Sequence, residues 1–196
     1  MNARSITRRG VVQLGAASLV AGVAARGSAP AVATQDDAGL PPLVMTDGYA
    51  GGGTVPSSLG EAQFSLAVFA RDRGDGSPVA LSGTFQLEDI NDPANPVTMT
   101  SDELTSYTAF STDRPNARQV TGWAKVNGLG PFPFLLQVED MAAVGDAADT
   151  FNLVFGDAAL PFLPGNDAGK NCDCGGFSYS LRGTVASGDL ARFALA

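Results

Sequence analysis

Apolar side chains occupy every second position along most of the chain beyond its first fifty residues. Phe64, Leu66, Val68 and Ala70 form one such series, and residues 81–87 repeat the pattern. A period of two places alternate side chains on opposite faces of an extended strand, so each segment predicts a half-buried β-strand. Further segments of this kind lie at residues 104–110, 120–126, 132–138, 151–155, 177–185 and 190–193.

Short stretches rich in glycine, asparagine, aspartate and proline separate these segments. Residues 72–78 form one of them, and Asn127-Gly128 is typical of a two-residue hairpin turn. Residues 141–149 would make at most one turn of helix. The sequence therefore predicts an all-β fold, an antiparallel β-sandwich or β-barrel of about eight or nine strands, and the pattern is compatible with either architecture.

The first 33 residues have the three parts of a signal peptide. A basic start carries Arg4, Arg8 and Arg9, an apolar stretch covers residues 11–25, and small residues end the segment at Ala33. The paired arginines, with two apolar residues shortly after them, resemble the twin-arginine export motif. The apolar stretch is shorter than the roughly 20 residues of a membrane-spanning helix. We therefore expect cleavage after Ala33, export, and no membrane span afterwards.

The remaining chain divides into an entry segment and one domain. Residues 34–50 contain proline, glycine and aspartate without periodicity, so we expect them to be flexible, and residues 51–196 to form a single β domain. Signal cleavage removes four of the 12 basic residues and none of the 20 acidic ones, which leaves a net charge of −12. Such a charge repels nucleic acid and anionic lipid, and we expect neither as a partner.

Five segments, taken in order, resemble a known family. They are Gly51-Gly52-Gly53-Thr54, residues 60–66, residues 83–87, residues 120–128 and residues 149–153, with residues 175–177 as a closing strand. These stretches are similar to the bacterial post-choice-of-anchor domain, a β module of exported and surface proteins. The resemblance implies an extracellular or cell-surface location, and it brings no catalytic residues to this chain.

The chain contains no histidine, which removes the usual general base of serine and cysteine nucleophiles and the commonest metal ligand. A pair of carboxylates could still hydrolyse a glycoside. The available glutamates are Glu61, Glu88, Glu103 and Glu139, and no spacing distinguishes two of them. We therefore predict no catalytic residue and no enzymatic activity, with a carboxylate-based glycosidase as the least favoured alternative.

Loops rich in aspartate suggest calcium, which prefers oxygen ligands. The candidate ligands are Asp89 and Asn91 in one loop, and Asp146 and Asp149 in another. Neither loop follows the twelve-residue calcium pattern, and turns use the same residues for their own backbone hydrogen bonds. We therefore expect no cofactor, with calcium as the alternative.

Three other residues are candidates for a special role. Cys172 and Cys174 are the two cysteines of the chain, and in an oxidising compartment we expect a local disulfide between them, with free or intermolecular thiols as alternatives. Trp123 lies on the strand face opposite Val120 and Gly122. It could stack on a sugar or anchor a partner, although a second packed layer would bury it equally well.

These observations support two hypotheses about function. The first is an exported, non-enzymatic β domain with a structural or binding role, whose partner is a protein or glycan at the cell surface. The second is a small β-barrel that binds an apolar ligand, as lipocalin-like and dirigent-like proteins do. The chain has 11 phenylalanines, and they could line a cavity as readily as they could fill a core.

Overall fold

The computed structural model describes residues 41–76, 79–141, 148–165, 172 and 174–194, so the predicted signal peptide at residues 1–33 lies outside the described residues. The described chain forms one antiparallel sheet of nine strands in the order β8-β7-β6-β5-β4-β3-β2-β1-β9. The strands and the short helix of the described residues are β1 (Val44–Ser57), β2 (Gly60–Asp72), β3 (Ala80–Asp89), β4 (Val97–Ser111), β5 (Arg114–Val126), β6 (Leu129–Glu139), β7 (Thr150–Gly156), η2 (Asp157–Phe162), β8 (Ser178–Thr184) and β9 (Ser187–Ala194). The prediction of an all-β antiparallel fold is confirmed.

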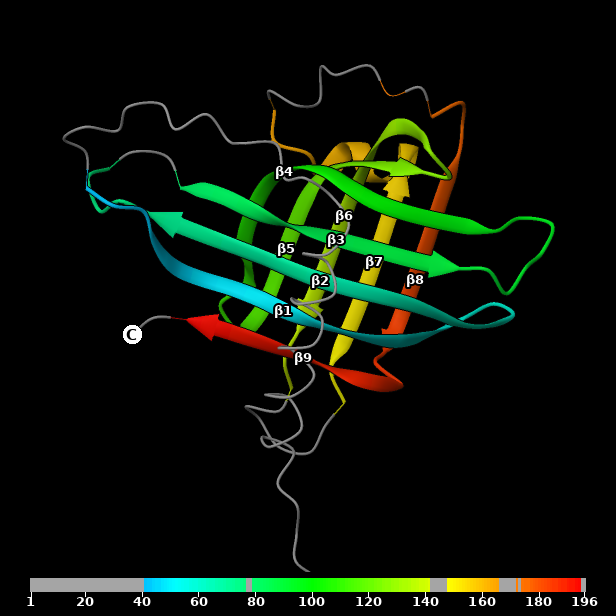
Figure 1. Cartoon of the computed structure of the whole chain (residues 1–196), viewed down its shortest axis with the longest axis horizontal. Coiled ribbons are helices and arrows are strands. Elements are labelled where there is room, and N and C mark those ends of the chain that lie inside the picture. The colour runs from blue at the N-terminus through cyan, green and yellow to red at the C-terminus, as the bar shows by residue number, and fades with distance from the viewer. Residues whose placement is uncertain (1–40, 77–78, 142–147, 166–171, 173, 195–196) are drawn as a thin grey trace, which may run out of the picture. The chain divides into compact units, whose positions relative to one another are not determined.

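The sheet curls into a half-barrel. Figure 1 shows β1, β2, β3 and β9 running crosswise in front of β5 to β8. The pairing of β4 with β5 shifts register three times, between Ser101 and Glu103, between Leu104 and Ser106, and again before Ser111. Bulges bend a strand and increase its twist, so these shifts allow one continuous sheet to fold back on itself.

Phenylalanines fill the inside of the half-barrel. The rings of Phe64 and Phe151 lie 4.6 Å apart, and Phe85 lies 6.0 Å from Phe134 and 6.2 Å from Phe151. These side chains are buried, as is Phe155, which stacks on Tyr179 at 4.9 Å. The inward phenylalanines therefore contact one another and form the core.

β1 begins earlier than the sequence pattern indicated. Residues 44–50, which we assigned to a flexible entry segment, belong to this strand, and it pairs with β2 on one side and β9 on the other. A Cβ atom on Gly53 would lie 1.9 Å from the carbonyl oxygen of Ser187, and one on Gly51 would lie 2.2 Å from that of Asp189. The glycine run therefore lets β9 approach closely, and pairing on both sides holds β1 extended without a clear alternation.

β8 and β9 follow each other in sequence but form the two edges of the sheet. The residues between them are held by two backbone hydrogen bonds, because Val185 N donates to Asp149 O just before β7 and Ala186 N donates to Thr54 O of β1, each over 2.8 Å. The outer edge of β9 is covered by side chains. Leu190 N donates to the Asp149 carboxylate over 2.8 Å, and Arg192 N donates to the Asp140 carboxylate over 3.2 Å.

A second, smaller apolar layer lies outside the sheet. The helix η2 contacts β6 and β7, and its Ala159 is fully buried. Leu135 of β6 and Trp123 of β5 are also buried, at 2% exposure each, although neither belongs to the interior cluster. Within the residues that the structure describes, no helix has the length and apolarity needed to cross a membrane.

Candidate functional site

Two neighbouring strands of the sheet separate along part of their length. β3 and β4 pair from Asp89 and Val97 as far as Gln86 and Thr100, and among the described residues their ladder extends no further. Beyond that point, Ala80–Thr84 pairs with β2 alone and Ser101–Ser111 pairs with β5 alone. We call these two segments the β3–β4 fork.

A pocket of about 410 Å³ lies at the fork. Both arms line it, Val79 and Leu81 from the β3 side and Thr105 to Ala109 from β4. The remaining lining residues are Thr46, Asp47, Ala70 and Arg118. The pocket therefore combines apolar and hydroxyl-bearing side chains with one ion pair, and none of the core phenylalanines lines it.

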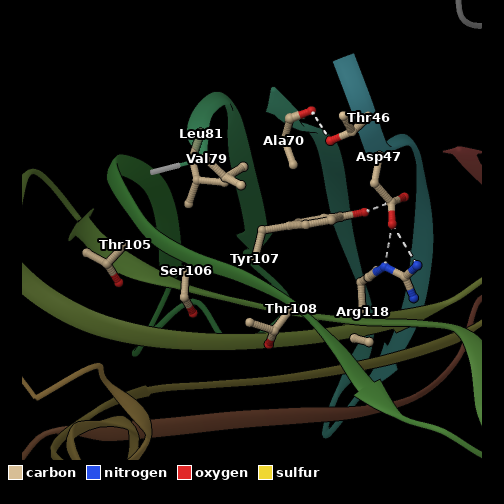
Figure 2. A pocket seen from close by; sticks show the side chains of 11 residues that line it. Thr46, Asp47, Ala70, Val79, Leu81, Thr105, Ser106, Tyr107, Thr108 and Arg118 are labelled. Atoms are coloured by element: carbon tan, nitrogen blue, oxygen red, sulfur yellow. Dashed lines mark hydrogen bonds and ion pairs between the residues drawn. The ribbon is translucent and has the colours of Figure 1, made fainter. Parts of the chain in front are cut away.

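A network of charged and phenolic side chains forms one wall of the pocket. Asp47 accepts hydrogen bonds from Arg118 Nε at 2.8 Å and from Arg192 Nη2 at 2.9 Å. Tyr107 donates its hydroxyl to the same carboxylate over 3.1 Å. Figure 2 shows Tyr107 reaching from β4 across the pocket toward Asp47, with Arg118 beside that carboxylate. We call these four side chains the Asp47 network.

The electrostatics of the Asp47 network fix its protonation. Burial alone would raise the pKa of Asp47, but hydrogen bonds from Arg192 and Arg118 outweigh it, so the pKa lies below its usual value of 3.8. Burial, followed by the negative charge of Asp47, raises the pKa of Tyr107 above its usual value. At neutral pH Asp47 is therefore ionised and Tyr107 keeps its proton. The network therefore braces one wall of the pocket through charged and hydrogen-bonded contacts.

Little in the sequence pattern indicated this site. Asp47 fell in the supposed entry segment, and Tyr107 matched no motif. Arg118 did carry a usable signal, because it lies in phase with the inward-facing Val120, Gly122 and Ala124 of β5. A charged residue at an inward position needs a charged or hydrogen-bonding partner, and that requirement distinguishes Arg118 from Lys125, which lies on the other face of the strand.

The predicted binding residue Trp123 is buried in this structure, with 2% of its surface exposed. Burial of this side chain was the alternative to a surface role. The indole ring is therefore not presented on the surface for stacking on a sugar or for anchoring a partner.

The predicted calcium ligands lie in separate environments. Asp89 and Asn91 are adjacent, but the Asp89 carboxylate already accepts hydrogen bonds from Asn91 Nδ2 at 2.8 Å, Tyr179 at 2.8 Å and Ser57 at 3.3 Å. Asp149 accepts from Met141 N and Leu190 N, whereas Asp146 lies outside the described residues. Across the described ranges these residues form no group of three metal-ligating side chains.

The two cysteines form a disulfide, with Cα atoms 5.1 Å apart. Asp157 at the start of η2 lies close to both sulfurs, and in the described chain these three residues are the one cluster with the spacing of metal ligands. A soft metal would need free thiolates, and here the sulfurs are bonded to each other.

Of the four glutamates considered for glycoside hydrolysis, Glu139 pairs with Arg114, whose Nε donates over 3.0 Å. Asp149 and Asp189, which are not among those glutamates, share a hydrogen bond between their carboxyl groups. Burial, followed by that hydrogen bond and the charge of Asp149, raises the pKa of Asp189 to about 6. The oxygens of Asp149 also accept hydrogen bonds from Leu190 N in β9 and from Met141 N after β6, so this pair braces the sheet.

Comparison with known proteins gave no match. No family model matches the chain, and neither the curated proteins nor the solved structures include a match to it.

Proposed function

We propose that this protein is exported and acts outside the cytoplasmic membrane as a non-enzymatic β domain that binds a partner at the β3–β4 fork. The observation that carries the binding role is the pocket of about 410 Å³ lined by both arms of the fork together with residues of β1, β2 and β5. Pockets of a few hundred cubic ångströms are typical of binding sites. Val79, Thr108 and Ala109 of the lining are exposed, so the pocket is accessible from solvent.

Three features of the chain support export. The first 33 residues have the three parts of a signal peptide, and their paired arginines resemble the twin-arginine motif. The disulfide between Cys172 and Cys174 suits an oxidising compartment. The resemblance to the post-choice-of-anchor domain adds a surface location to this proposal.

The non-enzymatic part of the proposal rests on the chemistry of the pocket. The chain has no histidine, and the acid and phenol at the fork are held in their ordinary ionisation states by the Asp47 network. An apolar ligand inside the half-barrel is less well supported than a partner at the fork, because phenylalanine rings occupy that interior.

Export is tested with the full chain expressed in a bacterium that has a twin-arginine translocase. We expect a protein that begins at Thr34 and lies outside the cytoplasmic membrane. The double variant Arg8→Lys/Arg9→Lys should remain inside and unprocessed, while Arg4→Lys, outside the arginine pair, should be exported normally. Unimpaired export of the double variant would exclude the twin-arginine route, and an intracellular wild type would overturn the proposed location.

Binding at the fork is tested by titrating the isotope-labelled protein with oligosaccharides, fatty acids and short random peptides while recording amide chemical shifts. We expect one class to shift the amides of Thr105–Ala109 and to lose that effect in Ala109→Trp, which places an indole at an exposed position in the pocket lining. Thr100→Trp, on the paired part of the same strand, is the matched control. If no class shifts these amides, the fork is not a binding site.

A further inference from the structure

We propose that the partner bound at the β3–β4 fork is an extended polypeptide segment, which pairs with the free edges of both strands and completes the sheet. This inference rests on the proposed binding role of the fork and names its ligand class. Three features favour such a segment: the backbone edges of the two arms, the hydrogen bonds already made by the lining side chains, and the apolar side chains that remain.

Each arm of the fork has a backbone edge without a neighbouring strand. A strand directs its N–H and C=O groups alternately to its two sides. Among the described residues, Ala80–Thr84 and Thr105–Ser111 have a strand ladder on one side only, so on the other side their backbone groups face the fork. An unpaired edge is a template for another strand, and here two such edges face each other across one pocket.

The point where the fork opens shows which groups are free. Phe85 N, one residue beyond the last β3–β4 pair, donates to Ser101 Oγ over 2.8 Å, so a side chain replaces the next rung of the ladder. Leu81 lies four residues before Phe85. Because the two residues are in phase along the strand, the N–H of Leu81 also points toward the fork. On the same arm, Ser82 Oγ is buried and has no hydrogen-bond partner among the described groups.

Most of the polar side chains that line the pocket, in contrast, are already engaged. The hydroxyls of Thr105 and Ser106 bond Thr121 Oγ1 at 3.0 and 2.6 Å, and Thr46 donates to Ala70 O over 3.3 Å. Asp47 is occupied by its two arginines and Tyr107. A sugar is recognised mainly through directed side-chain groups, whereas an added strand is recognised through backbone edges. Besides the hydroxyl of Thr108, the groups that remain available at the fork are those that a polypeptide backbone complements.

The lining also indicates the side chains of the bound segment. Alternate residues of an inserted strand would face the pocket, where they would meet Ala70, Leu81 and the ring of Tyr107. A fatty acid would require a continuous apolar lining, and the ion pair of Asp47 with Arg118 interrupts it. We therefore infer a segment with small apolar residues at every second position.

The test uses short random peptides selected on the full chain, followed by calorimetric titration of one selected peptide. We expect Ala109→Trp to weaken its affinity about tenfold or more, and Thr100→Trp to leave the affinity unchanged. The decisive comparison is the same peptide with one central backbone nitrogen methylated, which removes a hydrogen-bond donor and preserves every side chain. We expect the methylated peptide to bind about tenfold more weakly, and hydrogen exchange to slow at Leu81 and Thr105–Ala109 when the unmodified peptide binds.

Equal affinity of the methylated and unmodified peptides, or exchange protection away from the fork, would overturn the inference. A sugar or fatty acid that binds at the fork when no peptide does would also overturn it, yet would leave the proposed binding function in place. Failure of all three classes removes both, so the two proposals fail in distinguishable ways.

Discussion

The carboxylate of Asp47 joins three strands at one end of the half-barrel. Its partners Arg118 and Arg192 come from β5 and β9, at sequence separations of 71 and 145 residues. The Arg118 side chain is 8% exposed and that of Asp47 is 19% exposed, so this ion pair is sheltered from solvent. A sheltered pair contributes little net energy compared with apolar packing, but losing one partner leaves a buried charge uncompensated.

We therefore expect Asp47→Asn to destabilise the fold by about 3 kcal/mol, because two guanidinium groups lose their counterion. Urea unfolding, followed by the fluorescence of the buried Trp123, measures the difference. Asp102→Asn, which breaks an exposed pair with Lys125, is the control and should cost less than about 1 kcal/mol. A loss at Asp47 no larger than the control would mean that the network contributes nothing to stability.

The contribution of Asp47 to the unfolding free energy should depend on pH. The pKa of Asp47 is lowered in the folded protein, so its contribution to stability is present above 3.8 and is lost as the pH falls through the folded pKa. The difference in unfolding free energy between wild type and Asp47→Asn should therefore shrink below pH 3.8. A difference that is constant down to pH 2 would contradict this assignment.

Local sequence pattern could not assemble the Asp47 network. The alternation in β5 indicates that Arg118 faces inward, and to that extent one member of the site was predictable. Its partner Asp47 precedes the glycine run in a segment without alternation, and contact between them depends on pairing across the whole sheet. The disulfide between Cys172 and Cys174 is the opposite case. The two residues are separated by two positions in sequence, so their contact could be expected without knowing the fold.

Side-chain carboxylates take the place of a neighbouring strand along the outer edge of β9. Asp149 and Asp140 accept the N–H groups of Leu190 and Arg192, which lie on the side of β9 that faces away from β1. This arrangement covers an edge that would otherwise be open to another chain. It also brings Asp189 against Asp149, and near Asp140, where a third negative charge is unfavourable.

Asp189→Asn should therefore stabilise the protein in a pH-dependent way. The pKa of Asp189 is raised to about 6, so the folded state holds this proton more tightly than the unfolded state, and wild-type stability falls as the pH rises from 3.8 through 6. The Asp189→Asn variant has no carboxyl group to ionise at this position, so it does not lose this stability. We expect a gain on the order of 1 kcal/mol at pH 8, reduced by solvent screening at a partly exposed group, and none at pH 3.5. Urea unfolding at both pH values measures the difference in unfolding free energy between wild type and variant. A variant less stable than wild type at pH 8 would contradict the proposed repulsion between these carboxylates.

At the level of elements, alternation was a good guide where a strand has one buried and one solvated face. β2 is such a strand, with inward Phe64, Leu66 and Val68, and it was predicted. β1 was predicted only in part, because glycines that permit close approach of β9 carry no side-chain pattern. The separation of β3 from β4 was not predictable. Both arms have strand-like sequences, and nothing in those sequences marks the point at which the pairing between them ends.

The whole molecule depends on one continuous core rather than on a cavity. The all-β class followed from period-two alternation, but the choice between sandwich and barrel did not, because the bulges that curl the sheet lie in β4, where local sequence marks no bend. The structure is a single curled sheet whose inward phenylalanines touch. The stability of the fold should therefore depend strongly on each of these rings.

We expect Phe151→Ala to cost about 3 to 5 kcal/mol, because the ring of Phe151 contacts both Phe64 and Phe85 and its removal leaves a cavity. Phe162→Ala, at a ring that is 50% exposed, is the control and should cost far less. A hydrophobic dye should bind the variant and not the wild type. Saturable binding of the dye to the folded wild type would instead favour the apolar-ligand hypothesis.

The position of β1 affects how the chain is made. β1 lies between β2, which follows it directly, and β9, the last strand in the described chain. While β3 to β8 are being synthesised, one edge of β1 has no partner, and its glycine run makes that edge narrow and accessible. A nascent chain on the ribosome therefore has an unpaired, aggregation-prone strand edge for most of its synthesis. Folding can finish only after β9 has emerged.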